Sequence, residues 1–451
     1  MSSKNLFKWL VALLVATSIP AVAGSWQTQT VIANGGLGPW IAIDGSGNLA
    51  VAWGYSVYPI NENLARTGAI GQPWSSTVDL TGPLTGVLDL PQLHASASGN
   101  FTAIYNEGDP AVSMFVDHPA GGNWTTPAVI PGSSEAGQIT QYFPTFTSND
   151  RGDQAIAWGG GGPRGNANPI QVAVRPAGGV WQTPATIATG TFVTIDGEVT
   201  APDGTTAVSW ESYLASCGSR VCKTTNFVLH VSTLAPGSQS WVDSGPLLVG
   251  ATSQNHGLLA ADANGNLGVI SLSAGNVVSL VRHHNGVWTS PVIVASGSSL
   301  GLDMSHQPNE PADNRCFASD AVGHATVVGW GNVQATNLVA VDGNLQTNTW
   351  SAIKVITGSD QFPNYFRLAV SSAGQAVVAY PLVLDSNTIR AVVRPGAGQP
   401  WGAPATVGSA NDAGGLPITL TINSAGQAAI AFTAYTSDFT SFINYVNTYQ
   451  P

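Results

Sequence analysis

The sequence predicts an all-β fold, a single β-propeller of eight four-stranded antiparallel blades. Two repeated patterns support this prediction. A tryptophan is followed six residues later by an aliphatic residue eight times along the chain, and a glycine-centred hairpin follows each such segment. Successive tryptophans lie about 47 to 62 residues apart, a spacing that suits a four-stranded blade. Seven blades is the alternative. The eight pairs are Trp26/Ile32, Trp74/Leu80, Trp124/Ile130, Trp181/Ile187, Trp241/Leu247, Trp288/Val294, Trp350/Ile356 and Trp401/Val407.

The N-terminus has the pattern of a secretory signal peptide. Lys4 and Lys8 form a short basic region, an apolar run extends from Trp9 to Ile19, and Ala21-Val22-Ala23 offers a small-residue cleavage site. The apolar run is shorter than the roughly 20 residues that a membrane span needs. We therefore expect removal of residues 1–23, no membrane insertion afterwards, and a secreted or periplasmic protein.

The predicted mature chain, residues 24–451, is acidic but carries few charges. Without Lys4 and Lys8, 12 of the 14 basic side chains remain against 25 acidic ones, a formal charge of −13. Such a balance argues against nucleic acid as a partner. Only 9% of the residues are charged and 43% are hydrophobic, so the chain can bury a core beneath a largely neutral surface.

Each repeat begins with two strands around a glycine turn. Strand-length apolar runs lie on both sides of it, as in Trp40–Ile43 and Asn48–Trp53. An acid or hydroxyl stands early in most turns, and glycine occupies the place where a positive φ is expected. The turn glycines are Gly47, Gly99, Gly152, Gly204, Gly265, Gly323, Gly374 and Gly426.

An aromatic residue recurs six positions after the turn glycine, and we expect it to pack between neighbouring blades. Two repeats depart from this pattern. The fifth has Ser271, and the sixth has Gly329 followed by Trp330, which predicts a bulge or a shifted register. The aromatic residues are Trp53, Tyr105, Trp158, Trp210, Tyr380 and Phe432.

A third, alternating strand such as Ile170–Arg175 leads through a short turn to the next tryptophan strand, which is the fourth of the blade. The chain starts on a tryptophan strand, Ser25–Ile32, and ends on a third strand, Phe442–Asn447. We therefore predict that the N-terminal strand completes the last blade. Closure of the ring in this way removes exposed strand edges.

Two motifs carry a resemblance to a known group of proteins. Gly179–Ile187 has the form G-x-W-x-x-P-x-x-I, and Gly374–Tyr380 has the form G-x-A-h-h-h-W with tyrosine in the last place. Over residues 24–451 the chain resembles secreted bacterial β-propeller repeat proteins. The Ser-x-Asp-x-Gly-x-x-Trp turn of sialidases is absent, as are the repeat and the adjacent cysteine pair of quinoprotein dehydrogenases. The resemblance therefore implies the fold and neither activity.

The cysteines predict one disulfide. Cys217 and Cys222 are close enough in sequence to close a small loop in an oxidising compartment, and no other soft metal ligands lie near them. Cys316 lies in an apolar run, where we expect a buried thiol outside any disulfide.

The variable connections predict where function lies. Turns between the first two and the last two strands are short, whereas second-to-third and blade-to-blade connections vary, and these two classes emerge on one face. Ligand-binding residues are expected on such loops. The candidates are Tyr55, Tyr58, Asn106, Tyr142, Tyr213, Phe362 and Tyr365.

Several histidines are expected to be structural. His283 and His284 fall in a third-to-fourth-strand turn, hence on the opposite face, where we expect them to be exposed. His94 and His230 lie on apolar strands, where a hydrogen-bonded core histidine is the usual case.

Carboxylates at the variable face leave an enzyme open as an alternative, because glycan hydrolysis needs two of them about 5–10 Å apart. The most acidic loop holds Asp303, Glu310 and Asp313, but their spacing matches no known calcium loop. We expect no metal and no cofactor. If the protein is an enzyme, Glu107, Asp303 and Glu310 are the candidates. The carboxylates able to reach this face are Glu107, Asp109, Glu135, Glu211, Asp303, Glu310 and Asp385.

Taken together, the low charge and the abundant amide and tyrosine side chains favour binding over catalysis. We expect a monomeric, lectin-like propeller that recognises a neutral glycan or a cell-surface protein. A polysaccharide-acting glycosidase or lyase is the first alternative, and a structural surface or scaffold protein is the second.

Overall fold

A computed structural model gives the fold of the predicted mature chain, and the segment expected to be a signal peptide lies outside the described residues. The described residues contain no helix long and apolar enough to cross a membrane. They are 24–57, 60–82, 90–108, 112–133, 145–159, 169–190, 193–217, 222–250, 256–302, 316–331, 337–358, 360, 365–382, 388–409, 418–436 and 441–451.

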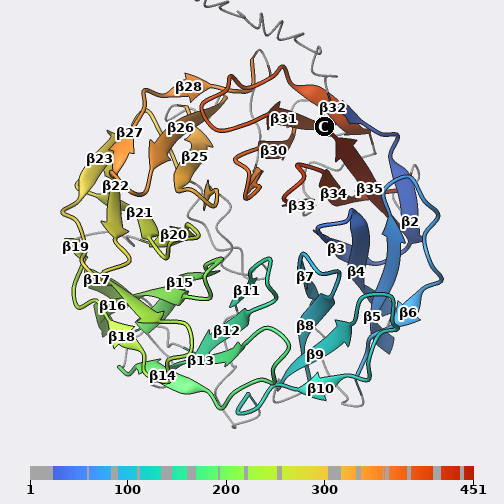
Figure 1. The fold of residues 1–451 in the computed structure, drawn as a ribbon, viewed down its shortest axis with the longest axis horizontal. Coiled ribbons are helices and arrows are strands. Elements are labelled where there is room, and N and C mark those ends of the chain that lie inside the picture. Colours follow the sequence, from blue (N-terminus) through green and yellow to red (C-terminus); the bar gives the residue numbers. More distant parts are fainter. Residues whose placement is uncertain are drawn as a thin grey trace, which may run out of the picture.

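Eight antiparallel sheets follow one another around a ring, as predicted (Figure 1). The first strand of each blade lies nearest the ring's centre and the fourth at its rim. Blade 1 consists of β3 (Leu37–Ile43), β4 (Asn48–Val57), β5 (Ile60–Ala69) and β6 (Val78–Asp79). Blade 2 consists of β7 (Gln92–Ala95), β8 (Phe101–Glu107), β9 (Val112–His118) and β10 (Ala128–Val129). Blade 3 consists of β11 (Thr145–Ser148), β12 (Gln154–Gly159), β13 (Ile170–Arg175) and β14 (Ala185–Ala188).

The middle of the chain forms three more blades, two of which have a rim strand in two pieces. Blade 4 consists of β15 (Val193–Thr200), β16 (Thr206–Cys217), β17 (Cys222–Leu234), β18 (Val242–Asp243) and β19 (Leu248–Gly250). Blade 5 consists of β20 (Leu258–Ala261), β21 (Leu267–Ser273), β22 (Asn276–Arg282) and β23 (Val292–Ser296). Blade 6 consists of β24 (Phe317–Ser319), β25 (His324–Trp330), β26 (Leu338–Asn344), β27 (Thr349–Trp350) and β28 (Lys354–Val355).

The two ends of the chain meet in blade 8, which confirms the predicted closure. Ser25 pairs with Gln450 and Thr30 with Val446, so the N-terminal strands form the rim of the last blade. Blade 7 consists of β29 (Arg367–Val370), β30 (Ala376–Pro381), β31 (Thr388–Arg394) and β32 (Ala405–Ser409). Blade 8 consists of β33 (Ile418–Ile422), β34 (Ala428–Tyr435), β35 (Phe442–Gln450), β1 (Ser25–Trp26) and β2 (Thr30–Asn34).

The glycine turns have the predicted chemistry. In blade 1, Oδ1 of Asp44 accepts hydrogen bonds from the backbone N–H groups of Ser46 and Asn48, both at 2.8 Å. Gly47 then adopts a φ of 85°, which a residue with a side chain rarely reaches. The turns also connect blades, because Asn423 of blade 8 donates its amide to the Asp44 carbonyl at 2.9 Å.

The aromatic residues after these turns are buried between blades, as predicted. Trp53 is 1% exposed and Tyr380 and Phe432 are fully buried. The prediction of a bulge or a shifted register in blade 6 is wrong, because β25 pairs with β26 without a register shift. A Cβ on Gly329 would lie only 2.3 Å from the Gly301 carbonyl, so backbone pairing with Gly301 leaves no room for an aromatic ring there.

Two of the repeated tryptophans lie in rim strands as expected, Trp26 in β1 and Trp350 in β27, and the other six precede theirs. Trp181 precedes β14, although the next residue, Gln182, still donates its backbone N–H to the Val174 carbonyl at 2.9 Å. Pro184 then interrupts the pairing because it has no N–H. Trp181 is 6% exposed and its seven counterparts are half-buried.

Arginines at the ends of third strands join neighbouring blades. Arg175 of blade 3 forms a two-pronged ion pair with Asp117 of blade 2, at 2.7 and 2.8 Å, and its guanidinium lies 5.3 Å from the centre of the Trp181 ring. Arg394 of blade 7 donates one hydrogen bond to Asp342 of blade 6, from Nη1 to Oδ1. These charges are structural, since each carboxylate already has its partner.

Candidate functional site

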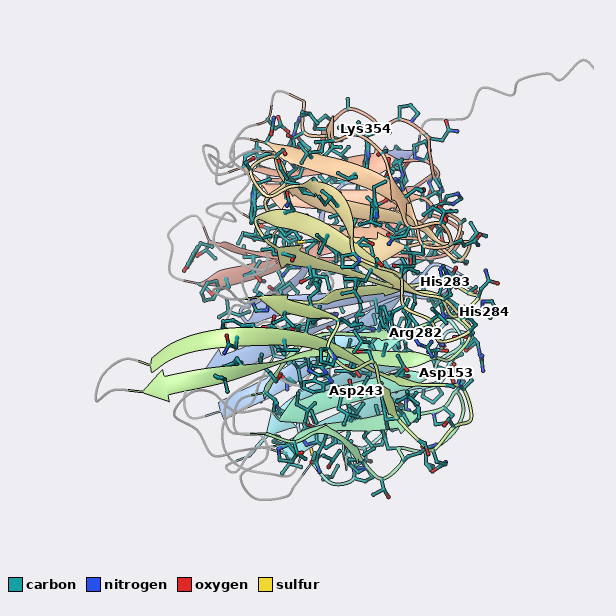
Figure 2. All side chains as sticks on the ribbon, turned by 90° about the vertical axis from the view of Figure 1, so that its left-hand side faces the viewer. Asp153, Asp243, Arg282, His283, His284 and Lys354 are labelled. Atoms are coloured by element: carbon teal, nitrogen blue, oxygen red, sulfur yellow. The ribbon has the colours of Figure 1, made fainter. Side chains whose placement is uncertain are left out.

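The two faces of the ring differ in the way that the connection lengths predict. His283 and His284 lie on the face of the short turns, and β16 and β17 project from the opposite side as a long hairpin (Figure 2). His284 is exposed and His283 half-buried. His230 stacks on Trp210 at 4.1 Å and contacts Asp243 at 3.3 Å, which gives it a structural environment.

The predicted ligand-binding residues within the described part of the chain lie on or beside strands, not in loops. Tyr55 belongs to β4 and Tyr213 to β16, where it packs on Phe227 at 5.4 Å, because these connections continue as paired strands. Asn106 is 3% exposed in β8 and accepts a hydrogen bond from Ser113 at 2.8 Å. Tyr365 is half-buried two residues before β29.

The other predicted residues fall where the structure gives no side-chain description. Tyr58, Tyr142, Phe362, Asp303 and Glu310 lie outside the described residues. The backbone register places Cys217 directly opposite Cys222 at the end of the β16–β17 hairpin. Their side chains are not described, so the disulfide stays a prediction. Cys316 is completely buried.

Glu107, the remaining enzyme candidate, is buried between blades 1 and 2. Its Oε2 accepts a hydrogen bond from the Gly82 backbone at 2.9 Å, and its exposure is zero. Burial, and secondly the charge of Glu107, raise the pKa of Tyr105 above its ordinary value. Glu107 therefore belongs to a different blade interface from the cluster described next.

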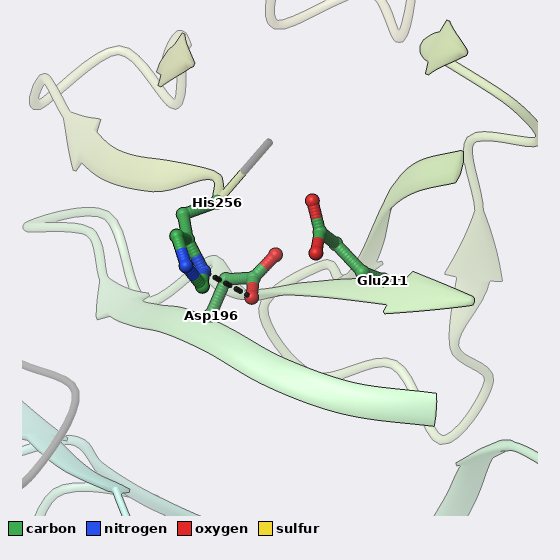
Figure 3. Close-up of side chains that lie close together, drawn as sticks. All are labelled: Asp196, Glu211 and His256. Carbon is green, nitrogen blue, oxygen red and sulfur yellow. Dashed lines mark hydrogen bonds and ion pairs between the residues drawn. The ribbon is translucent and has the colours of Figure 1, made fainter. Parts of the chain in front are cut away.

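A cluster of Asp196, Glu211 and His256 lies between blades 4 and 5 (Figure 3). Asp196 Oδ1 is 3.1 Å from His256 Nδ1, and one side-chain nitrogen or oxygen of each residue lies within 4.8 Å of the other two. Asp196 is 1% exposed, Glu211 fully buried and His256 7% exposed. We call this group the Asp-Glu-His cluster.

Local backbone features bring the three side chains together. Asp196 is the extra residue of a bulge in β15, between the pairs Ile195↔Trp210 and Gly197↔Ser209. A bulge reorients the side chain that it carries. Glu211 lies on β16, opposite Thr194.

His256 enters the cluster from the next blade, two residues before β20, with a φ of 25°. The next residue, Gly257, is held by two hydrogen bonds. Gly257 donates its N–H to Asp196 Oδ2 at 3.3 Å, and the Ser209 hydroxyl donates to the Gly257 carbonyl. Asp196 lies midway along β15 and Glu211 midway along β16, whereas His256 precedes β20, so the cluster lies toward the side of the variable connections.

Glu198, two residues after Asp196, faces blade 3 instead. Thr145 donates its hydroxyl to Glu198 Oε2 at 2.9 Å, and burial raises the pKa of this carboxyl to about 8. It is a buried carboxyl outside the Asp-Glu-His cluster.

The chemistry of the cluster is that of an oriented acid–base group. The contact between Asp196 Oδ1 and His256 Nδ1 orients the imidazole, the side-chain type that most often transfers protons in catalysis. Glu211 adds a second carboxylate. Sequence reasoning placed Glu211 at the variable face but missed Asp196 and His256. The available signal was the acid Asp196 within a first strand, where the next repeat has only apolar residues, Leu258–Ala261.

Comparisons with known proteins give similarity at the level of the fold. No protein-family model and no curated protein matches the sequence. A puromycin hydrolase mutant in complex with PGG is 15% identical over 88% of this chain and 58% of its own, with a TM-score of 0.49. This chain therefore spans little more than half the length of that hydrolase.

Two glycan-acting enzymes are also structurally similar. Polysaccharide lyase Uly1 is 11% identical over 96% of this chain and 94% of its own, with a TM-score of 0.48. The NanB sialidase of Streptococcus pneumoniae is 10% identical over 94% and 69%, with a TM-score of 0.37. Similarity at these values does not extend to function.

Proposed function

We propose that the protein is an enzyme that cleaves glycosidic bonds in an extracellular polysaccharide, and that the Asp-Glu-His cluster is its reaction centre. The observation that carries this proposal is the meeting of two carboxylates and an imidazole within 4.8 Å on the variable side of the ring. Acid–base cleavage of a glycan needs at least one group that gives and one that takes a proton.

Each residue has a distinct part in this proposal. His256, the most exposed of the three at 7%, is the proton-transfer group nearest to a bound substrate. Asp196 orients the His256 imidazole through its contact with Nδ1. Glu211 supplies the second carboxylate that a two-step cleavage uses.

The charge of the chain favours a neutral glycan. A formal charge of −13 after signal removal would repel a polyanionic substrate. Such a polymer is met outside the cytoplasm, in agreement with the predicted signal peptide. N-terminal sequencing of protein recovered from the periplasm or medium should begin at Gly24.

Turnover on a panel of neutral and uronate-containing polysaccharides tests the proposal. Reducing ends should appear with a neutral polymer, and the ultraviolet absorbance of unsaturated uronate would indicate a lyase instead. Glu211→Gln and His256→Gln should each lower turnover at least about 100-fold, the usual size of an acid–base contribution. Asp243→Asn, which removes the partner of His230, is the matched control and should leave turnover unchanged.

Two outcomes would contradict the proposal. Turnover that survives both substitutions would place the reaction centre elsewhere. Saturable glycan binding without any bond cleavage would leave the lectin-like function that the composition favours.

A further inference from the structure

We propose that the Asp-Glu-His cluster binds one divalent transition-metal ion of the manganese or zinc type. The inference deepens the proposed function, on which it rests for the reaction, because it names the group through which the cluster would act. The binding site itself stands on the geometry of Asp196, Glu211 and His256.

The distances suit a shared ion. Zinc and similar ions hold nitrogen and oxygen ligands at about 2.0–2.2 Å, so two ligand atoms on one ion lie about 3.0 to 4.3 Å apart. Asp196 Oδ1 and His256 Nδ1 are separated by 3.1 Å, and a bound ion would take the place of the proton between them. All three potential ligand atoms lie within 4.8 Å of one another, so small side-chain adjustments bring Glu211 to the same ion.

The ligand types select the class of metal. Imidazole suits zinc, iron, nickel and copper, whereas carboxylates suit manganese and the harder ions, so one histidine with two carboxylates favours a borderline ion. Calcium prefers six to eight oxygen ligands and is a poor match for imidazole. Three protein ligands also leave a coordination position for water or substrate, which is the arrangement of catalytic rather than structural zinc sites.

The charges favour a cation as well. Asp196 and Glu211 are 1% and 0% exposed, and two buried carboxylates in proximity repel each other. A divalent ion held by both carboxylates offsets both charges. The ion would also polarise its bound water, which would then carry the proton transfer in place of the coordinated imidazole.

Other histidine–carboxylate pairs provide an internal comparison. His230 and Asp243 are 3.3 Å apart, but the Asp243 side chain is 43% exposed. His324 and Asp320 are 2.8 Å apart, but the His324 side chain is 48% exposed. Among the residues that the structure describes, these pairs lack a third ligand. There, three potential ligand atoms lie within 4.8 Å of one another only in the Asp-Glu-His cluster.

Neighbouring groups orient the ligands. The Gly257 N–H holds Asp196 Oδ2 at 3.3 Å, which leaves Oδ1 directed toward His256. Outer hydrogen bonds of this kind fix ligand orientation and commonly change metal affinity 10–100-fold.

Titration calorimetry of the full protein, freed of metal by a chelator, tests the inference with manganese chloride and zinc chloride. We expect one site per chain. Glu211→Gln and Asp196→Asn should each weaken binding at least about 100-fold. Glu198→Gln and Asp243→Asn, which alter a buried carboxyl and a histidine pair outside the cluster, should bind as the unaltered protein does.

Anomalous diffraction from a crystal soaked in zinc chloride locates the ion without any substitution, so it applies even if a variant fails to fold. A peak among Asp196, Glu211 and His256 supports the proposal. A peak elsewhere, no binding up to millimolar metal, or tighter binding of calcium than of manganese and zinc would overturn it.

Turnover separates this inference from the proposed function. One ion per chain at the cluster, with no cleavage of any polysaccharide, would retain the metal site and refute the enzyme. Cleavage that is unaffected by the chelator, in a protein that binds no ion, would refute the metal site and retain the enzyme.

Discussion

Replacement of Trp181 by alanine tests whether the repeated tryptophans serve the framework. The side chain is 6% exposed and contacts the Phe115 ring edge-on at 6.1 Å. Burial of about 200 Å² at about 25 cal/mol per Å² corresponds to about 5 kcal/mol. Measured losses for Trp→Ala in cores are about 3–5 kcal/mol, so we expect destabilisation in that range.

Chemical denaturation followed by circular dichroism measures this loss. Trp241→Ala is the matched control, because Trp241 has the same place in the repeat but is half-buried, and it should lose less than half as much. A Trp181→Ala protein within 1 kcal/mol of the unaltered one, and unable to bind glycan, would refute the reasoning. The repeated tryptophans would then be ligand platforms.

Three further predictions concern the ring. The raised pKa of Glu198, about 8 against an ordinary 4.5, means that the folded state holds the proton more tightly, so stability should fall as pH rises from 4.5 to 8. Glu198→Gln should flatten that part of a curve of Tm against pH. An unchanged slope would contradict the raised pKa of Glu198. Arg175→Met should cost about 1–3 kcal/mol in urea unfolding by leaving Asp117 unpaired, and adding Asp117→Asn should recover part of the loss. Removal of residues 24–34 exposes the edge of β35 and should produce aggregates in size-exclusion chromatography, whereas an elution profile like that of the unaltered protein would contradict a stabilising role for this closure.

The ring could be predicted from the sequence because each blade repeats the same local signals. Gly47 and its counterparts mark a turn with a positive φ, and the aromatic residue six places later marks the contact with a neighbouring blade. Closure followed from the two ends, since Ser25–Ile32 supplies the strand that the last repeat lacks. Extended pairing at Tyr55 and Tyr213 was missed, because connection length alone does not distinguish a loop from a longer hairpin.

The Asp-Glu-His cluster could not be predicted in the same way, because its members meet only in three dimensions. Asp196 and His256 belong to different blades, and their contact depends on how blade 5 packs on blade 4. The bulge that reorients Asp196 leaves no turn signal in the sequence. Glu211 was visible as one of several carboxylates, but nothing in the chain's order distinguished it from Glu107, which serves a different interface.

Comparison of the repeats shows why Glu211 is not a framework residue. The position seven residues after the turn glycine follows the recurring aromatic residue on the second strand, and it holds an acid in one repeat only. The eight residues are Gly54, Asn106, Gly159, Glu211, Leu272, Trp330, Pro381 and Thr433. The other seven are uncharged, so the blade does not require a carboxylate there. A buried carboxylate lowers stability unless it is compensated, so its occurrence in this one repeat favours a role specific to blade 4. Asp196 and His256 lie beside Glu211, and the ion proposed for the three residues would give the carboxylate that role.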